Sequence, residues 1–345
     1  MPEALAVDHY VQTGVGNPAK LLSDLRFWTW NTVEVMAMIE WMRAWNAAGH
    51  QPRVHFSGFD MGYAGVAIDS VTAYTARVDP GAGASVAGAY SCLNQLRNPP
   101  NSYFVDFTRY AALSAESKAA CRQGIQGVDS LFARSVAAWS SAEGAGKNRV
   151  MRRLARIVDQ WEVMSSAPAD QGFYVRDQFM AENVGWWHDT QAPGSKMVLW
   201  AHNGHISRVS RLMGDHLSRK YGAAYIPVGQ TFGTGSFNAI FLSDANQLLN
   251  NRVHTVTGFR EEAIERIFTS IGVDRLIFDA RRLRSASGPA IEPLGLPLTM
   301  RSVGASFQPS SGVNGYQVPL QLRSDYDLII WFSNATASRL LPFIP

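Results

Sequence analysis

The chain has 345 residues, of which 46% are hydrophobic and 17% are charged, so it has enough apolar material for a large folded core and is not a disordered protein. Its 31 basic and 28 acidic residues give a net charge of +3 without a long run of Lys and Arg, which disfavours nucleic-acid binding. Apolar runs such as Met197–Ala201 are far shorter than the ~20 residues of a membrane-spanning helix, so no membrane partner is expected.

The cysteines and the first residues bear on the compartment. Cys92 and Cys121 are too few for a disulfide-based scaffold or a cysteine-only zinc site, and we expect them to be buried or half-buried thiols. The first residues lack a basic segment followed by an apolar stretch, so no secretion signal is predicted. A cytoplasmic location is therefore expected.

The first part of the chain is predicted to be mostly helical. Apolar residues recur at helical spacing from the start, and a further helix is predicted after Asn31, which has Glu34 three residues on, in the spacing of a capping box. The predicted buried stripe of this helix consists of Val35, Met38, Ile39 and Met42. The segment Arg53–Asp60 then predicts a short strand with Asp60 at its carboxyl end, where open α/β sheets bind ligands.

A long helical stretch is predicted from Ala64 to about Asp189, with Ser114–Trp139 and Lys147–Met164 forming a helical hairpin. An α/β pattern begins at Lys196. Its predicted elements are a buried strand Met197–Trp200, a helix Ser207–Tyr221 closed by Gly222, short strands at Ala224–Gly229 and Phe237–Leu242, a helix Glu261–Ile271, and strands Arg275–Asp279 and Tyr326–Phe332.

These elements together predict the fold class and the domain organisation. The strand, helix, strand order after Lys196 is typical of a parallel crossover, so we expect an α/β fold with a mostly parallel sheet flanked by helices. Residues 1–63 and 190–345 are expected to form the α/β core, and residues 64–189 a long helical insertion.

The segment Trp200–His205 is the strongest candidate for chemistry. His202, Asn203 and His205 follow an apolar run and precede a helix, where a doubly wound sheet presents its active-site loops. Imidazoles transfer protons near neutral pH and can donate hydrogen bonds to a developing oxyanion. Two alternatives stay open: one imidazole lies in the core while the other caps the next helix, or the pair binds zinc, although no third ligand is obvious.

A second candidate lies in the predicted helix around Arg176 and Asn183. These two residues share one face with Met180, while Glu182 lies on a neighbouring face close to several aromatic residues. A partly desolvated Glu182 with an Arg partner could act as a base or orient a histidine. A solvated polar helix face is the alternative. Glu34 and Asp60 have the same double interpretation, as substrate-facing groups or as capping and turn residues.

Several sequence motifs are absent. The chain contains no Gly-x-Ser-x-Gly motif, which argues against a covalent-serine mechanism of the α/β-hydrolase type. It also has no Gly-x-x-x-x-Gly-Lys-Ser/Thr loop and no Gly-x-Gly-x-x-Gly motif after a strand. No nucleotide or other cofactor is therefore expected.

Five motifs occur in an order that resembles the erythromycin esterase family, and the similarity extends over nearly the whole chain, to Met213-Gly214 and Arg301-Ser302-x-Gly304. The five are Phe27-Trp28-x-Trp30-Asn31-Thr32-x-Glu34, Trp41-Met42-Arg43-x-x-Asn46, Gly58-Phe59-Asp60, Arg176-Asp177-x-x-Met180-Ala181-Glu182-Asn183 and Trp200-Ala201-His202-Asn203-x-His205.

This resemblance implies an α/β core with a helical insertion, and a metal-independent hydrolysis of a carboxylic ester in a small-molecule substrate. The family is known best for opening the macrolactone ring of erythromycin-type antibiotics, which confers antibiotic resistance. A histidine acts there as general base on water, without a covalent serine. The resemblance implies that His202 and His205 orient the substrate and stabilise the tetrahedral intermediate. It also makes Arg176 and Glu182 catalytic candidates. The substrate-binding candidates are Trp30, Glu34, Asp60, Asn183 and Asn203.

One departure from the family concerns the general base. The family's base lies in a Gly-Glu-x-x-His motif, upstream of the segment that matches Pro2-Glu3-Ala4, and this sequence lacks that motif. We expect a truncated chain whose true start lies ~60–70 residues upstream, enough for two strands and a helix. The alternatives are an inactive homologue that binds a small molecule, and a metal-dependent hydrolase that uses His202 and His205.

Overall fold

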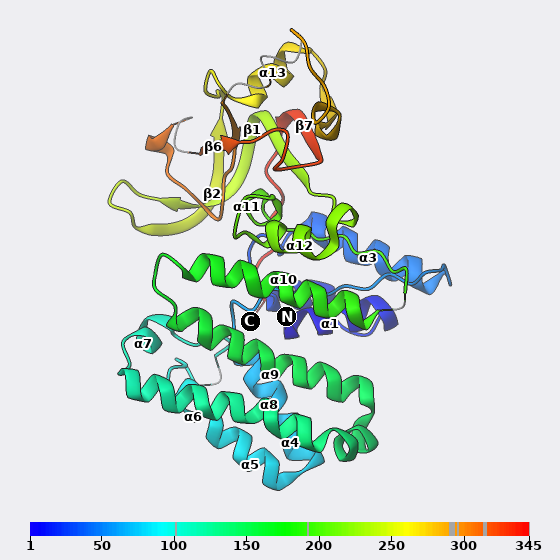
Figure 1. The fold of residues 1–345 in the computed structure, drawn as a ribbon, viewed down its shortest axis with the longest axis vertical. Helices are drawn as coiled ribbons and strands as arrows, with labels where there is room; N and C mark the ends of the chain where they lie inside the picture. The colour runs from blue at the N-terminus through cyan, green and yellow to red at the C-terminus, as the bar shows by residue number, and fades with distance from the viewer. Residues whose placement is uncertain (101, 192, 290–293, 295–296, 313–315, 345) are drawn as a thin grey trace. The chain divides into compact units, whose positions relative to one another are not determined.

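The computed structural model describes the chain except for residues 101, 192, 290–293, 295–296, 313–315 and 345 (Figure 1). The chain divides into two compact units. The helical unit comprises Met1–Leu25, Met38–Gln191 and Ile344, and the sheet unit comprises Arg26–Ala37 and Ala192–Phe343. We expected residues 1–63 in the α/β core, but most of this segment makes its contacts within the helical unit.

The helical unit is built around a core of aromatic side chains. Tyr74, Phe132, Trp139 and Trp161 are each at most 2% exposed, and they come from three different helices. The predicted hairpin of α8 and α9 is confirmed, with only Gly144 between the two helices (Figure 1). The helices up to Gln191 are α1 (Pro2–Thr13), α2 (Pro18–Asp24), α3 (Val33–Ala47), α4 (Gly65–Val78), α5 (Pro80–Ala89), α6 (Ser91–Asn94), α7 (Phe107–Ala111), α8 (Ala115–Glu143), α9 (Ala145–Ser166) and α10 (Gly172–Thr190). The first residues of α3, up to Ala37, belong to the sheet unit, and the rest to the helical unit.

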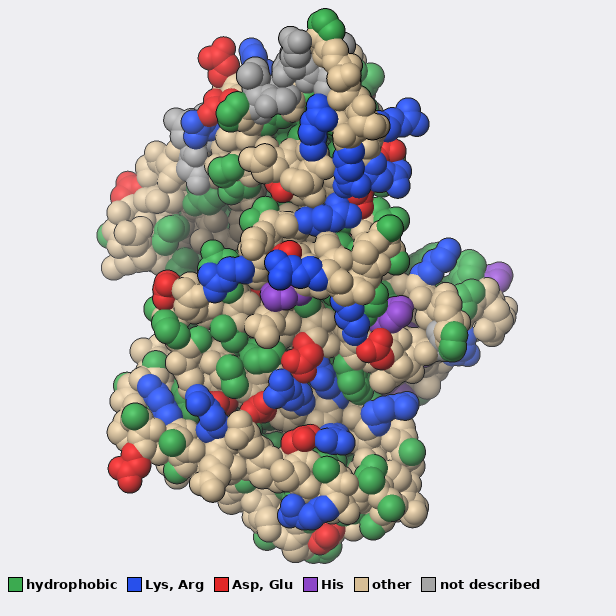
Figure 2. Space-filling view, in the orientation of Figure 1, with side chains coloured by type: hydrophobic (Ala, Val, Ile, Leu, Met, Phe, Trp, Pro, Cys, Tyr) green, Lys and Arg blue, Asp and Glu red, His purple; other side chains and the backbone are tan. Residues whose placement is uncertain are grey.

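Charged side chains of both signs are scattered over the face that Figure 2 shows. In the helical unit, ion pairs such as Arg77–Glu143 and Arg152–Asp129, at 2.9 and 2.8 Å, join neighbouring helices or segments. Within the described part of the chain, no helix is both long enough and apolar enough to cross a membrane.

The expectation of two free thiols is wrong. Cys92 and Cys121 form a disulfide that joins α6 to α8, because the packing of these helices brings their Cα atoms to 5.8 Å, within disulfide range. The residues are 29 apart in sequence, and closing a loop of that size typically stabilises a fold by about 3–4 kcal/mol. Structural disulfides persist mainly in oxidising compartments, so this pairing counts against the expected cytoplasmic location.

The predicted strand Arg53–Asp60 is also wrong. Among the described residues the segment pairs with no strand, and side chains from helices bond to its backbone groups instead. Asn46 of α3 bonds both the N–H and the carbonyl of Val54, at 2.9 and 2.8 Å, and Asp8 of α1 accepts from the N–H of Phe56 at 2.9 Å. Asp60 consequently lies in a loop of the helical unit rather than at the end of a strand.

The sheet unit confirms the α/β class but corrects the expected sheet. The strand order is β2-β1-β7-β3, and β5 also pairs with β1. β1 is parallel to β7 and β5, whereas β1–β2 and β3–β7 are antiparallel, so the sheet is mixed. The reason is that β2 follows β1 through a short turn, which permits only an antiparallel neighbour (Figure 1).

The elements of the sheet unit differ from the prediction mainly in number. The two short strands expected around residues 224–242 are one long strand, β1. The elements are α11 (Asn203–Ile206), α12 (Met213–Tyr221), η1 (Gly222–Ala224), β1 (Val228–Leu242), β2 (Leu248–Val256), α13 (Ile264–Ser270), β3 (Arg275–Asp279), η2 (Ala280–Leu283), β4 (Leu298–Arg301), β5 (Ser306–Phe307), η4 (Pro309–Ser311), β6 (Gln317–Leu320) and β7 (Leu328–Ala335).

The core of the sheet unit lies between α13 and one face of the sheet. Ile329 and Trp331 of β7 are at most 1% exposed, and Phe268 of α13 packs against the indole of Trp331. The predicted buried strand Met197–Trp200 does not form. This segment forms no helix or strand, it has no strand partner among the described residues, and Val198 is 96% exposed. An apolar run becomes a buried strand only where a neighbouring strand and a covering layer exist.

Candidate functional site

His202 is held by hydrogen bonds at both of its ring nitrogens. Its Nδ1 accepts a hydrogen bond from the backbone N–H of Gly204 at 3.1 Å, which makes His202 the N-cap of α11. Its Nε2 lies 3.0 Å from the backbone carbonyl of Val303. Because a backbone N–H needs a lone pair and a carbonyl needs a proton, this geometry selects the neutral tautomer that is protonated at Nε2.

The surroundings of His202 favour the same neutral form. Desolvation, and next the charge that a protonated His205 would carry, lower the pKa of His202. The two rings lie 6.4 Å apart between centroids, nearly perpendicular. His202 is therefore neutral near pH 7 and has no ring nitrogen available as a base in this structure. His202 is thus a helix cap, as one expected alternative had it for one of the two histidines, but the helix that it caps is the short α11 and not the predicted helix Ser207–Tyr221.

Asn203 fixes the same turn to the sheet. Its amide donates to the carbonyl of Gln230 on β1 at 2.6 Å and accepts from the N–H of the same residue at 3.0 Å. Its own carbonyl accepts from the hydroxyl of Tyr326 at 3.1 Å. The side chain thus replaces a neighbouring strand at this point of β1. These bonds anchor the segment that carries His205.

Trp30 and Glu34 belong to the sheet unit as well. The Trp30 ring meets the Trp200 ring edge-on, with 5.0 Å between centroids. Glu34 is not part of a capping box, because the hydroxyl of Thr32 caps α3 by accepting from the N–H of Val35 at 3.1 Å. The Glu34 carboxylate instead accepts two hydrogen bonds from Arg339, at 3.1 and 3.2 Å.

In the helical unit, Arg176 and Asp60 form a two-point ion pair. The guanidinium Nε and Nη2 atoms lie 3.1 and 2.5 Å from the two carboxylate oxygens. Burial raises the pKa of Asp60, but the Arg176 guanidinium outweighs it and holds the pKa below the usual range. Asp60 also accepts from the N–H of Gly62 at 3.1 Å, as a turn residue does. The pair is charged at neutral pH.

Glu182 is paired with two arginines that the sequence interpretation missed. Arg153 donates to it at 3.1 Å, and Arg156 approaches both of its oxygens at 3.3 Å. Burial raises the pKa of Glu182, but the two arginines outweigh burial, so the pKa is lowered overall. Arg156 has the larger effect of the two. A carboxylate with a lowered pKa is a weak base. Both arginines lie on α9, and their spacing of three along a helix was the signal available in the sequence.

Asn183 supports the loop that carries Asp60. It is fully buried, its amide nitrogen donates to the carbonyl of Phe59 at 2.7 Å and to Gln160 at 3.0 Å, and its oxygen accepts from Arg153. The structure therefore links Asn183 to the residue just before Asp60, a contact across 124 positions of sequence. Among the residues that the structure describes, no group of three or more His, Cys, Asp and Glu is arranged to hold a metal ion.

The chain matches the erythromycin esterase family over residues 1–335. It belongs to the erythromycin esterase family. Three solved structures are similar to it in fold and cover 99% of its length. An erythromycin esterase mutant, EreC in its open conformation, has a TM-score of 0.70, with 14% identity and 82% of that chain covered.

The other two structures have a TM-score of 0.79. One is described as a succinoglycan biosynthesis protein, with 19% identity and 79% of that chain covered. The other is a protein from Bacillus cereus, with 20% identity and 80% of that chain covered. At these identities the similarity supports the fold.

The ion pair between Arg176 and Asp60 leads to a stability prediction for this erythromycin esterase family member. Arg176→Met removes both guanidinium bonds from Asp60, and we expect it to lower the free energy of unfolding by about 2 kcal/mol at pH 7. Because the pKa of Asp60 is lowered in the folded state, the wild-type advantage is present above the unfolded-state pKa and disappears as the pH falls through the folded-state pKa. Urea unfolding at pH 7 and in steps below pH 4 measures both effects.

Arg149→Met is the matched control, because Arg149 is exposed on α9 of the same unit. We expect it to change the unfolding free energy by less than about 0.5 kcal/mol. A loss for Arg176→Met that is no larger than the control, or one that does not depend on pH, would contradict the assigned role of the ion pair.

Proposed function

We propose that this chain is the substrate-binding and transition-state-stabilising part of an enzyme that hydrolyses a carboxylic ester, of the macrolactone type, with histidine chemistry and without a covalent serine or a metal. The observation that supports this most is the anchored turn 202–205. Four hydrogen bonds join the side chains of His202 and Asn203 to Gly204, Val303 and Gln230, and they anchor the turn that carries His205. A histidine on an anchored turn can donate a preorganised hydrogen bond to a tetrahedral intermediate, which lowers its energy. With a macrolactone antibiotic as substrate, the activity would confer antibiotic resistance.

The proposed roles follow from the hydrogen bonds. His205 is the group that meets the reacting ester, and His202, whose nitrogens are occupied, acts through His205 as a positioning residue. Arg176 and Glu182 are proposed as further catalytic residues, which contribute a positive and a negative charge. Of the residues expected to bind substrate, Trp30, Glu34 and Asp60 are proposed as substrate contacts. Asn183 and Asn203, whose amides bond within the protein, are proposed to hold the loop at Asp60 and the turn 202–205 in place.

The general base is proposed to come from an additional polypeptide segment that carries the family's Gly-Glu-x-x-His motif. Neither His202, which has no available nitrogen, nor Glu182, whose pKa is lowered, fits this role. Two segments outside helices and strands, 53–60 and 197–200, support an additional segment, because both have strand-like sequences without a strand partner among the described residues, and Val198 is 96% exposed.

A hydrolysis assay tests the proposal. This chain and an N-terminally extended form that contains the motif are each incubated with an erythromycin-type macrolactone and with a simple ester. We expect hydrolysis by the extended form and a rate at least ~100-fold lower for the short chain, since removing a general base typically costs 10²–10⁴-fold. Activity in the extended form should survive a chelator.

Equal activity of the two forms would contradict the missing-base proposal. Loss of activity with a chelator, restored by zinc, would favour the metal-dependent alternative. If neither form hydrolyses the esters, titration with a macrolide under tryptophan fluorescence identifies a binding homologue by a saturable signal without turnover.

A further inference from the structure

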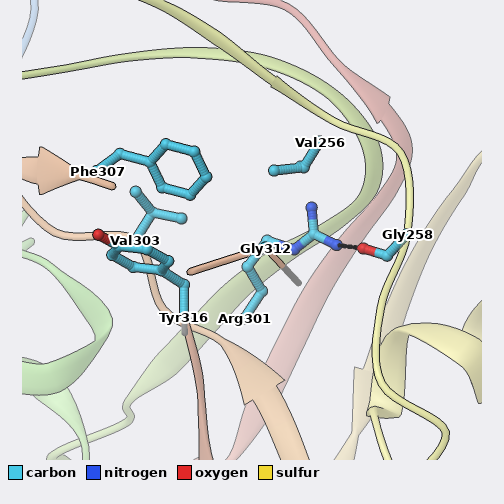
Figure 3. Close-up of a pocket in the computed structure, with 7 residues that line it drawn as sticks. All are labelled: Val256, Gly258, Arg301, Val303, Phe307, Gly312 and Tyr316. Atoms are coloured by element: carbon cyan, nitrogen blue, oxygen red, sulfur yellow. Dashed lines mark hydrogen bonds between the residues drawn. The ribbon is translucent and has the colours of Figure 1, made fainter. Parts of the chain in front are cut away.

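The sheet unit contains a pocket beside the turn 202–205. The residues that line this pocket have no role in the proposed hydrolysis. Phe307 and Tyr316 form one wall, with their ring centroids 4.6 Å apart, and the guanidinium of Arg301 faces the space across from them (Figure 3). Val256 and Val303 complete the apolar lining, and the backbone of Gly258 and Gly312 closes it. None of these lining residues is acidic.

Arg301 is buried and only partly satisfied. Arg301 is 6% exposed. Its terminal nitrogen Nη2 donates to the carbonyl of Gly258 at 2.5 Å, and its guanidinium carbon lies 4.7 Å from the centroid of the Phe232 ring. The other terminal nitrogen, Nη1, is buried and has no hydrogen-bond partner among the described residues. Leaving a buried N–H of a charged group without an acceptor is costly, so this nitrogen favours an occupant that can accept.

Glu265, a buried acidic residue bonded to the backbone of Arg301, does not accept a hydrogen bond from Nη1. Glu265 is fully buried, and its carboxylate accepts from the backbone N–H of Arg301 at 2.8 Å and from the hydroxyl of Thr231. The described contacts include no hydrogen bond between this carboxylate and the guanidinium. Glu265 therefore offsets part of the buried charge without satisfying Nη1.

The size of the pocket limits what it can hold. The pocket is small and partly open to solvent, so it suits a ligand of a few heavy atoms and not a whole drug-sized molecule. A guanidinium edge matches the two oxygens of a carboxylate, and an apolar wall suits a short alkyl chain. We propose that Arg301 and this pocket bind the carboxylate of a small organic acid.

The position of the pocket links it to the histidine turn. The side chain of Val303 lines the pocket, while its carbonyl lies 3.0 Å from Nε2 of His202. The same residue, Val303, therefore lines the site of a bound carboxylate and holds His202 in place. Ester hydrolysis releases a carboxylate, but the proposal does not depend on hydrolysis, because binding is measured without turnover.

Isothermal titration with sodium acetate, at constant ionic strength, tests the pocket directly. We expect one saturable site with a dissociation constant on the order of 1 mM for so small a ligand. Acetamide, which has nearly the same shape as acetate but no charge, should bind at least ~10-fold more weakly. No saturable acetate binding, or equal binding of acetamide, would overturn the proposal.

Two variants locate the site. Arg301→Gln should weaken acetate binding at least ~10-fold by removing the charge, and Val256→Phe should do the same by filling the space while the guanidinium stays. Arg281→Gln, at an exposed arginine paired with Asp279, is the matched control and should bind acetate as the wild type does. Circular dichroism establishes that each variant is folded, and Val256→Phe decides the test if Arg301→Gln is not. Unchanged binding in a folded Val256→Phe variant would place acetate elsewhere.

Discussion

Gly214→Ala is expected to destabilise the sheet unit by about 3 kcal/mol, because the new methyl group has no space. A Cβ at Gly214 would lie 2.3 Å from the backbone oxygens of both Ile206 and Ser207, and neither can move without moving the chain. Gly214 lies in the first turn of α12, so the helix and the segment 206–207 would separate. Urea or thermal unfolding measures the loss.

The same variant is expected to affect catalysis. Ile206 directly follows His205, and a displacement of about 1 Å in a catalytic group can reduce a rate 10²-fold. We therefore expect kcat/KM of the extended, active form to fall at least ~10-fold. Gly304→Ala is the matched control, since a Cβ there meets no atom within 4 Å. If Gly214→Ala is as stable and as active as Gly304→Ala, the close packing of α12 on the segment 206–207 does not support the site.

Substitutions of the two histidines should separate positioning from chemistry. His205→Ala should lower kcat/KM of the active form by ~100-fold or more with little change in stability, if His205 acts on the transition state. His202→Ala should lower both, because it removes the cap of α11, a loss of about 1 kcal/mol. His202→Asn should recover most of the stability and rate, since Asn is a strong N-cap that accepts from the N–H of Gly204.

His205→Asn is the control for this rescue and should stay as slow as His205→Ala. Rates and unfolding midpoints of all four variants make the comparison. A His202→Asn variant that is stable but as slow as His202→Ala would assign the ring of His202 a direct chemical role. Full activity of His205→Ala would remove His205 from the proposed mechanism.

The helices could be predicted from the sequence because their hydrogen bonds are local. The periodicity of Ser114–Trp139 and Lys147–Met164 located α8 (Ala115–Glu143) and α9 (Ala145–Ser166) within a few residues at most ends. One strand was also predicted with its observed bounds, Arg275–Asp279. Elsewhere a strand depends on a partner far away in the sequence.

The strand predictions that failed show this dependence. The mixed segment Arg53–Asp60 and the apolar run Met197–Trp200 both have strand-type sequences, but neither has a strand partner among the described residues. β2, Leu248–Val256, was not predicted, since its polar composition gave no signal and its pairing to β1 provides its hydrogen bonds. The disulfide of Cys92 and Cys121 likewise depends on the packing of two helices.

The candidate site divides in the same way. Sequence patterns predicted the helices, the α/β class, the residue types of the site and their resemblance to the erythromycin esterase family. The hydrogen-bond partners of those residues became known from the folded chain, because the partners lie far along the sequence: Val303 is 101 positions from His202, and Asp60 is 116 from Arg176. Those partners set the proton on His202 and the charge of Asp60, since a pKa depends on the groups around a side chain and not on its neighbours in sequence.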